Sequence, residues 1–114
     1  MCAVFERQKL GAVDIIRGTD PLNLENAKQF SAVLEECCRQ GQPRVVVDLE
    51  RVPLIDSAGL EILLDFRDSV LERGGVLKVA GPSPLCREIL TVTGLSEQVE
   101  IFRDLQAAVA SFAQ

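Results

Sequence analysis

Hydrophobic and polar positions alternate with two different periodicities along the chain, one typical of strands and one typical of helices. The β-branched residues Val13, Ile15 and Ile16 favour a strand, and Gly11 separates it from a short strand before it, so we expect a hairpin there. A continuous apolar run at Val45, Val46 and Val47 favours a central strand that is buried on both faces. The predicted strands span residues 3–9, 12–17, 44–49, 76–80 and 99–102.

Apolar residues at intervals of three and four predict helices between these strands. Asn23 is the expected N-cap of the first helix, and a Gly-Gly pair ends the second. Ser83 is expected to cap the third helix with Pro84 at its first position, and Asp104 to cap the last. The predicted helices span residues 24–40, 57–73, 84–92 and 105–113.

The element order ββαβαβαβα defines the fold class. Strands that are separated by helices of this length imply right-handed crossovers and therefore a sheet that is mostly parallel, with the N-terminal hairpin making it mixed. No internal repeat or linker interrupts the pattern, so residues 1–114 are predicted to form one α/β domain.

The net charge limits the classes of partner that the protein is expected to bind. The chain has 12 basic and 17 acidic residues, a net charge of −5, which argues against a nucleic-acid-binding protein and against electrostatic docking on anionic membranes. Apolar runs are far too short to span a membrane, and the N-terminus has no signal-peptide pattern. We therefore expect a cytoplasmic protein that does not insert into membranes.

The absence of histidine excludes several kinds of catalytic site and metal site. It removes the usual general base, the Ser-His and Cys-His nucleophile pairs, and imidazole metal sites. The four cysteines form no CxxC motif and are expected to be reduced thiols. No phosphate-binding glycine loop or metal-ligand spacing occurs, so we predict no cofactor, no metal and no enzymatic activity.

One short motif stands out at the start of the second predicted helix: Asp56, Ser57, Ala58, Gly59 and Leu60. Two interpretations of Ser57 remain open here, a plain helix N-cap and a phosphoryl acceptor. A phosphate would meet the positive end of the helix dipole and free N–H groups, so it would change the surface without unfolding the domain. Gly59 is expected to leave this turn uncovered, so that another molecule can approach closely.

A second candidate lies on the same helix. Four carboxylates, Glu61, Asp65, Asp68 and Glu72, recur at spacings of four, three and four and share one stripe of the helix. The stripe is either a solvated face or a docking surface for a basic partner that begins beside Ser57. The core of this helix is assigned to Leu60, Leu63, Leu64, Val70 and Leu71.

Taken together, these segments resemble the STAS domain, in particular the small stand-alone anti-sigma factor antagonists of bacteria. The resemblance rests on residues 45–49, the motif at 55–60, the glycine pair 74–75 and the Gly-Leu pair at 94–95, and it covers nearly the whole chain. The D-S-x-G-L element is its most specific part.

The resemblance implies a partner switch. The serine of this motif, here Ser57, is phosphorylated by an anti-sigma factor that is also a serine kinase, which supplies the ATP site. The unphosphorylated protein binds that factor and frees the sigma factor, phosphorylation breaks the complex, and a PP2C-type phosphatase restores it. An acidic contact at the start of the first helix is typical of the family. Its best matches here are Asn23 and, earlier in a longer loop, Asp20.

An alternative remains within the same resemblance. The chain is then a constitutive STAS subunit of another assembly, such as a lipid-transport ATPase complex, and is never phosphorylated. Such subunits tend to lack a phosphorylatable serine in the motif, whereas Ser57 is present here.

Overall fold

The computed structural model describes residues 5–39 and 41–112, and a five-stranded sheet runs through its centre. The strands lie in the order β1-β2-β3-β4-β5. β1 is antiparallel to β2, and the other neighbouring pairs are parallel, as the element order predicts. The strands are β1 (Phe5–Leu10), β2 (Val13–Gly18), β3 (Arg44–Asp48), β4 (Val76–Ala80) and β5 (Glu100–Phe102).

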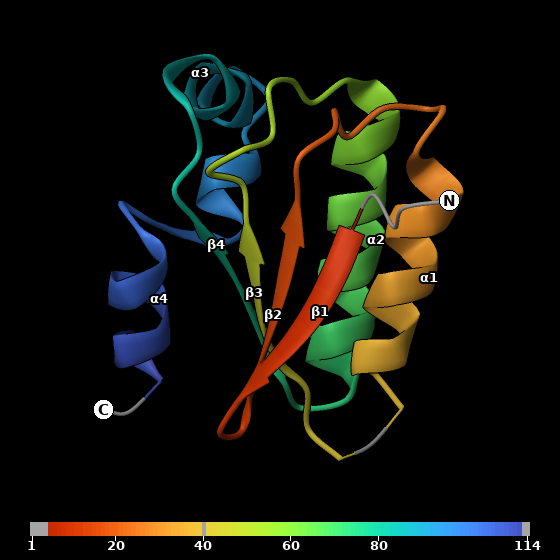
Figure 1. Cartoon of the computed structure of the whole chain (residues 1–114), viewed down its shortest axis with the longest axis vertical. Helices are drawn as coiled ribbons and strands as arrows, with labels where there is room; N and C mark the ends of the chain where they lie inside the picture. Colours follow the sequence, from red (N-terminus) through yellow and green to blue (C-terminus); the bar gives the residue numbers. More distant parts are fainter. Residues whose placement is uncertain (1–4, 40, 113–114) are drawn as a thin grey trace.

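The helices cover the sheet unequally. Two of them pack on one face, the fourth lies on the other, and the third sits at the end where the parallel strands finish (Figure 1). No helix in the described ranges has the length and apolar character that crossing a membrane requires. The helices are α1 (Ala27–Cys37), α2 (Ser57–Glu72), α3 (Pro84–Val92) and α4 (Leu105–Ser111), with a short 3₁₀ turn, η1 (Leu95–Glu97), before β5.

Two apolar cores hold these layers together. Alternate residues of β3 point to opposite faces, so Val45 and Val47 join the large core under α1 and α2, while Val46 joins the small core under α4. All three are buried, which confirms the prediction of a strand buried on both sides.

The small core contains a buried cation. Lys78 of β4 places its Nζ atom 4.2 Å from the centre of the Phe112 ring and 2.6 Å from Oγ of Ser111, next to the end of α4. The aliphatic stem of the lysine packs while its charge meets an aromatic face and a hydroxyl acceptor. This contact fastens a helix of only seven residues to the sheet.

Three of the four predicted helix starts and the predicted end of α3 are confirmed, while α2 ends at Glu72 and α4 at Ser111. Ser83 caps α3 by accepting a hydrogen bond from the backbone N–H of Cys86, with Pro84 at the first position, and Asp104 caps α4 through Ala107. Gly74, with φ of +74°, ends α2: its N–H and that of the next glycine bond the carbonyls of Leu71 and Val70.

The first helix is shorter than predicted. α1 begins at Ala27 rather than 24, and its N-cap is Asn26, not Asn23. The residues before it are held by hydrogen bonds to the loop that precedes α2, which keeps them out of a helix. At the other end, the N–H groups of Cys38 and Arg39 bond three residues back, which tightens and ends the helix; residue 40 lies outside the described residues.

The core face of α2 also differs from the prediction. Leu63 and Val70 are buried as expected and Leu60 is half-buried, but Leu64 and Leu71 are exposed. Phe66 occupies the inner face instead, because a helix turns its inward stripe through positions spaced by three and four. Smaller shifts affect the ends: β5 begins at 100 instead of 99, and the predicted residues 3–4 and 113 lie outside the described ranges.

Candidate functional site

The candidate site lies at the carboxyl ends of the parallel strands, where α2 begins. Asp56 is the N-cap of α2, and its Oδ1 atom accepts a hydrogen bond of 3.0 Å from the backbone N–H of Gly59. Ser57 is therefore not the cap, which corrects the N-cap interpretation. It is the first helical residue, it is exposed, and its hydroxyl has no hydrogen-bond partner in the described part of the chain.

Two loops that are far apart in sequence form one rigid unit here. Leu22, in the loop between β2 and α1, pairs with Ile55 as an isolated parallel bridge. Its N–H donates to the carbonyl of Leu54 at 2.9 Å, and its own carbonyl accepts from the N–H of Asp56 at 3.0 Å. The Asp56 carboxylate also accepts from the N–H of Leu24 at 3.4 Å. These contacts place the loop before α1 directly beside the motif at 56–60.

Gly59 has a different role from the one predicted. A β-carbon at this position would lie 2.8 Å from the β-carbon of Leu22 and would also collide with its backbone. The glycine is buried, so it does not leave the turn open to another molecule. Its hydrogen side chain instead lets the first turn of α2 pack against the neighbouring loop.

The second predicted contact, Asp20 or Asn23, lies in that same loop. Oδ1 of Asn23 accepts a hydrogen bond of 3.0 Å from the N–H of Asn26, and the Asn26 side chain donates to the carbonyl of Pro21. Asp20 accepts a hydrogen bond from the hydroxyl of Thr19. Asn23 is one residue from Leu24, whose N–H donates to the Asp56 carboxylate, whereas Asp20 forms no hydrogen bond with the α2 loop within the described chain.

The four acidic residues of α2 form one exposed stripe, as predicted. Asp68 pairs with Arg67 at 3.1 Å, and Arg67 is itself held by the carbonyl of Gln98. Glu61, Asp65 and Glu72 have no ion-pair partner among the described residues. Three unpaired carboxylates on one helix face leave a negative surface, and the exposed Leu64 lies beside it.

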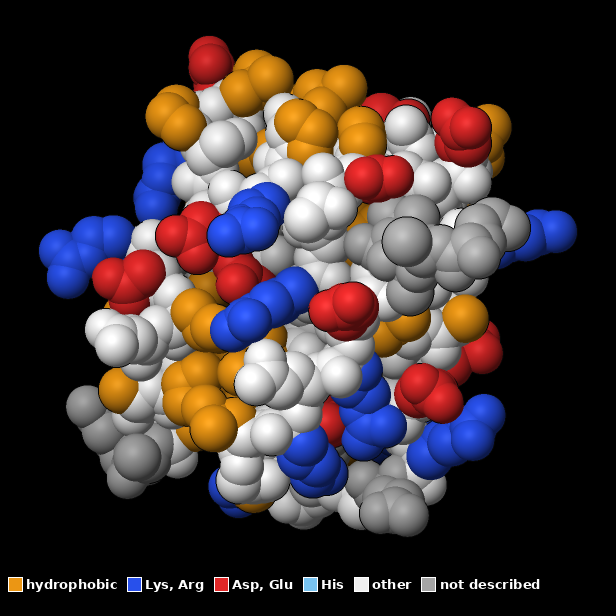
Figure 2. Space-filling view, in the orientation of Figure 1, with side chains coloured by type: hydrophobic (Ala, Val, Ile, Leu, Met, Phe, Trp, Pro, Cys, Tyr) orange, Lys and Arg blue, Asp and Glu red, His pale blue; other side chains and the backbone are white. Residues whose placement is uncertain are grey.

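Sequence reasoning missed three exposed leucines at this end of the molecule. Leu24 is 78% exposed, Leu54 41% and Leu85 50%, and they come from the three loops or helix starts that follow β2, β3 and β4. Hydrophobic side chains accordingly gather along the upper end of the visible face (Figure 2). Hydropathy alone does not separate an exposed leucine from a core leucine, so only the fold reveals this patch.

The described residues meet neither the requirements of a metal site nor those of a reactive thiol. No group of three or more Cys, Asp or Glu side chains in the described ranges has the arrangement of a metal site. Cys37, Cys38 and Cys86 are buried free thiols, and burial raises the pKa of Cys37 to about 12. A thiol in this state is a weak nucleophile.

Comparison with known proteins agrees with the fold. Residues 5–108 match the STAS domain family, and the chain belongs to this family. The chain is 32% identical to the "Putative anti-sigma factor antagonist BtrV" of Bordetella bronchiseptica over 80% of its length and 78% of that protein's.

Two solved structures are also similar. One is a crystal structure from Thermotoga maritima, described as a "putative anti-sigma factor antagonist", with a TM-score of 0.89 and 25% identity over 96% of this chain and 95% of that one. The other is the anti-sigma factor antagonist SpoIIAA in its unphosphorylated form, with a TM-score of 0.81 and 20% identity over 96% of both chains. Four helices and a mixed five-stranded sheet with an antiparallel N-terminal hairpin are common to this fold.

Proposed function

We propose that this protein is an anti-sigma factor antagonist that is switched by phosphorylation of Ser57. In its unphosphorylated form it binds an anti-sigma factor with serine kinase activity and releases the sigma factor. The observation that carries the proposal is the position of Ser57: it is exposed, it is first in α2, its hydroxyl has no partner among the described residues, and it lies beside two hydrogen-bonded loops. The antagonist named BtrV and the solved antagonists of the same fold support the general role.

The chemistry at Ser57 is then supplied by the partner. The kinase transfers the terminal phosphoryl group of ATP to Oγ, so that a new P–O bond forms, the bond to ADP breaks and the hydroxyl proton leaves. SpoIIAA, which shares the fold, has also been solved in a phosphorylated form. A PP2C-type phosphatase would hydrolyse the phosphoserine and restore binding.

A phosphate at Ser57 would disturb the surface more than the fold. It adds about 1.5 to 2 negative charges at the end of a helix where the N–H groups of Ser57 and Ala58 have no acceptor in the described chain. Those donors and the helix dipole offset the cost within the protein. Glu61 follows one turn later on the same stripe, so the partner would meet a longer negative strip.

The binding surface that we propose combines apolar and acidic parts. The exposed leucines Leu24, Leu54 and Leu85 would supply apolar contact around Ser57. The acidic residues of α2 would steer a basic partner toward it. Gly59 is buried and acts on this surface only through packing. The other residues expected to take part are Asp20, Asn23, Asp56, Ala58, Leu60, Glu61, Asp65 and Asp68.

Mass spectrometry of protein isolated from its own cells tests the modification. We expect a species heavier by about 80 Da, one phosphoryl group, that maps to Ser57. The Ser57→Ala variant should lack it. The matched variant Ser69→Ala, which removes another exposed serine of α2, should keep it. Phosphate that persists in Ser57→Ala, or wild-type protein that is never phosphorylated, would contradict the switch.

Capture of the partner tests the binding. Ser57→Ala should retain the anti-sigma factor with serine kinase activity and Ser57→Asp should release it, because the added charge stands in part for the phosphate. The alternative, a constitutive subunit of a complex such as a lipid-transport ATPase, predicts a transporter partner whose binding is the same in both variants.

A further inference from the structure

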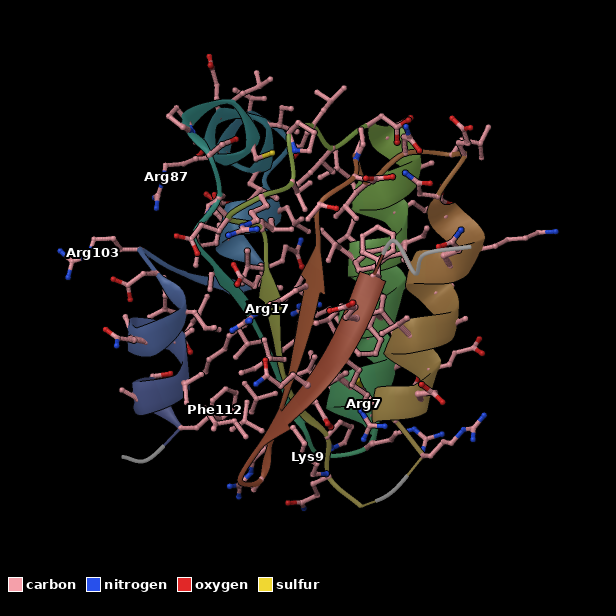
Figure 3. All side chains as sticks on the ribbon, in the orientation of Figure 1. Arg7, Lys9, Arg17, Arg87, Arg103 and Phe112 are labelled. Carbon is pink, nitrogen blue, oxygen red and sulfur yellow. The ribbon has the colours of Figure 1, made fainter. Side chains whose placement is uncertain are left out.

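A basic pocket lies at the end of the molecule opposite Ser57, where the parallel strands begin. It has a volume of about 270 Å³. β1 runs antiparallel to β2, so its last residues reach this end, and α1 also finishes here before β3 starts. Arg7 and Lys9 point into this region in Figure 3, and several basic side chains gather at the lower end in Figure 2. The pocket is lined by four cations, Arg7, Lys9, Arg39 and Arg44.

The protein neutralises only part of this charge. Asp14, which is 4% exposed, sits among the lining residues with Oδ1 3.0 Å from Nε of Arg7 and 3.9 Å from Nζ of Lys9. Glu36 is the second carboxylate of the lining. The pocket therefore holds an excess of two positive charges in a chain whose net charge is −5.

The excess resides in two particular arginines. Arg39 and Arg44 form no ion pair with any residue in the described ranges, although both line the same small pocket from different elements. Their like charges repel, and the two carboxylates of the lining, Asp14 and Glu36, offset only part of the positive charge. A guanidinium offers paired N–H donors that match the oxygens of a phosphate group.

We infer that this pocket binds a small soluble oxyanion that carries phosphate groups, of about the size of a diphosphate. The volume is below the range of about 300 to 1,000 Å³ that is typical of sites for larger ligands, so the phosphate groups and not a bulky attached group would fill it. Arg39 and Arg44 would bind the oxygens directly. Arg7 and Lys9, already turned toward Asp14, would add to the positive potential.

Titration with inorganic pyrophosphate at constant ionic strength and pH 7.5 tests the inference, with backbone amide NMR shifts as the readout. We expect saturable binding with the largest shifts at the end of α1 and the start of β3. The double variant Arg39→Gln with Arg44→Gln should weaken the dissociation constant at least about tenfold, because it removes charge-assisted hydrogen bonds.

The matched control removes the same charge elsewhere. Arg87 and Arg103 lie away from the pocket, in the upper left of Figure 3, and both are exposed. Arg87→Gln with Arg103→Gln should leave pyrophosphate binding unchanged. Equal weakening by both double variants would reduce the effect to net charge and overturn the proposal.

Two further outcomes would also overturn it. One is the absence of saturable pyrophosphate binding in the wild-type protein. The other is binding only to vesicles that contain phosphatidic acid, which would indicate a membrane-facing charge patch without a pocket. The partner switch at Ser57 is tested with different variants, so a negative result for the pocket would not contradict it.

Discussion

Gly59 and Leu22 are packed so closely that the position of Gly59 has no room for a side chain. A β-carbon on Gly59 would lie 2.8 Å from the β-carbon of Leu22 and nearer still to its carbonyl oxygen. That same carbonyl accepts the N–H of Asp56, the cap of α2. One glycine thus allows the loop before α1 and the first turn of α2 to act as a single platform under Ser57.

Gly59→Ala should therefore destabilise the protein. Overpacking typically costs about 1 to 3 kcal/mol, which exceeds the gain of at most about 1 kcal/mol from replacing a helical glycine with alanine. Urea unfolding followed by circular dichroism measures the change in free energy. Ser69→Ala, an exposed position on the same helix, should stay within about 0.5 kcal/mol of wild type. A Gly59→Ala protein as stable as wild type would show that the contact with Leu22 relaxes without cost.

The Asp56 carboxylate should matter more than an ordinary helix cap. It accepts from Gly59 within α2 and from Leu24 in the other loop, whereas Asp104 caps α4 through Ala107 and otherwise pairs only with its exposed neighbour Arg103 at 3.7 Å. Loss of a cap costs about 0.5 to 2 kcal/mol. We expect Asp56→Ala to lie at or above the upper end of that range.

Asp104→Ala provides the comparison, since it removes a cap without a second loop contact. Both free energies of unfolding come from urea titrations under the same conditions. If Asp56→Ala costs no more than Asp104→Ala, the bond from Leu24 contributes nothing measurable. Asp56→Asn, which keeps an acceptor oxygen, should recover part of the loss.

Local rules predict much of this fold because its signals are local. The glycine pair that ends α2 and the Ser-Pro start of α3 act through the backbone of their own helix, so they can be read from the sequence. The true start of α1 could not be read in this way. Leu22 and Leu24 are bonded to residues more than thirty positions away, and this tertiary contact keeps residues 24–26 out of the helix. Asn23 still accepts a cap-type hydrogen bond from the N–H of Asn26, but the bond closes a turn before α1 and not the helix itself.

The candidate site also has parts that the local sequence predicts and parts that only the fold reveals. Ser57 and the acidic stripe lie within one helix, so their spacing was sufficient to find them. The prediction that Leu64 and Leu71 belong to the core is wrong, because periodicity indicates a stripe without telling how wide the buried part is. The basic pocket draws on β1, α1 and β3, and no local pattern connects residues that the topology alone brings together.

The acidic stripe should control how fast a partner binds. Asp65→Lys with Asp68→Lys reverses two charges on the exposed face of α2 and should lower the association rate constant about tenfold at low salt. Stability should change little, because both side chains are exposed and only Asp68 has an ion pair. Stopped-flow or surface-binding kinetics with the protein captured by Ser57→Ala measures the effect.

The control reverses two exposed carboxylates away from α2 that form no ion pair with a described residue, Glu6→Lys with Glu88→Lys. It changes the net charge by the same amount and should leave the rate within about twofold of wild type. An equal drop in both double variants would assign the effect to overall charge. High salt should reduce the difference between wild type and the stripe variant, since surface charges are screened.

Buried thiols should make the protein sensitive to alkali. Burial, with a smaller contribution from the Asp14 carboxylate, raises the pKa of Cys37 from 9.0 to about 12, and burial also raises the pKa of Cys38. Below pH 9 the thiol keeps its proton in both states and the full stability is present. Between pH 9 and 12 the unfolded chain loses the proton while the folded one retains it, so the free energy of unfolding falls as the pH rises.

Urea titrations from pH 8 to 11 measure this slope, which reaches at most about 1.4 kcal/mol per pH unit for one thiol. The chain has no tyrosine to add to it. Cys37→Ala should be less stable at pH 8, because a buried side chain is lost, but its stability should fall less steeply with pH than that of wild type. Identical slopes would mean that Cys37 does not hold its proton on folding. Iodoacetamide labelling of native protein at pH 8 gives a second readout, in which Cys37 should react only after urea unfolds the chain.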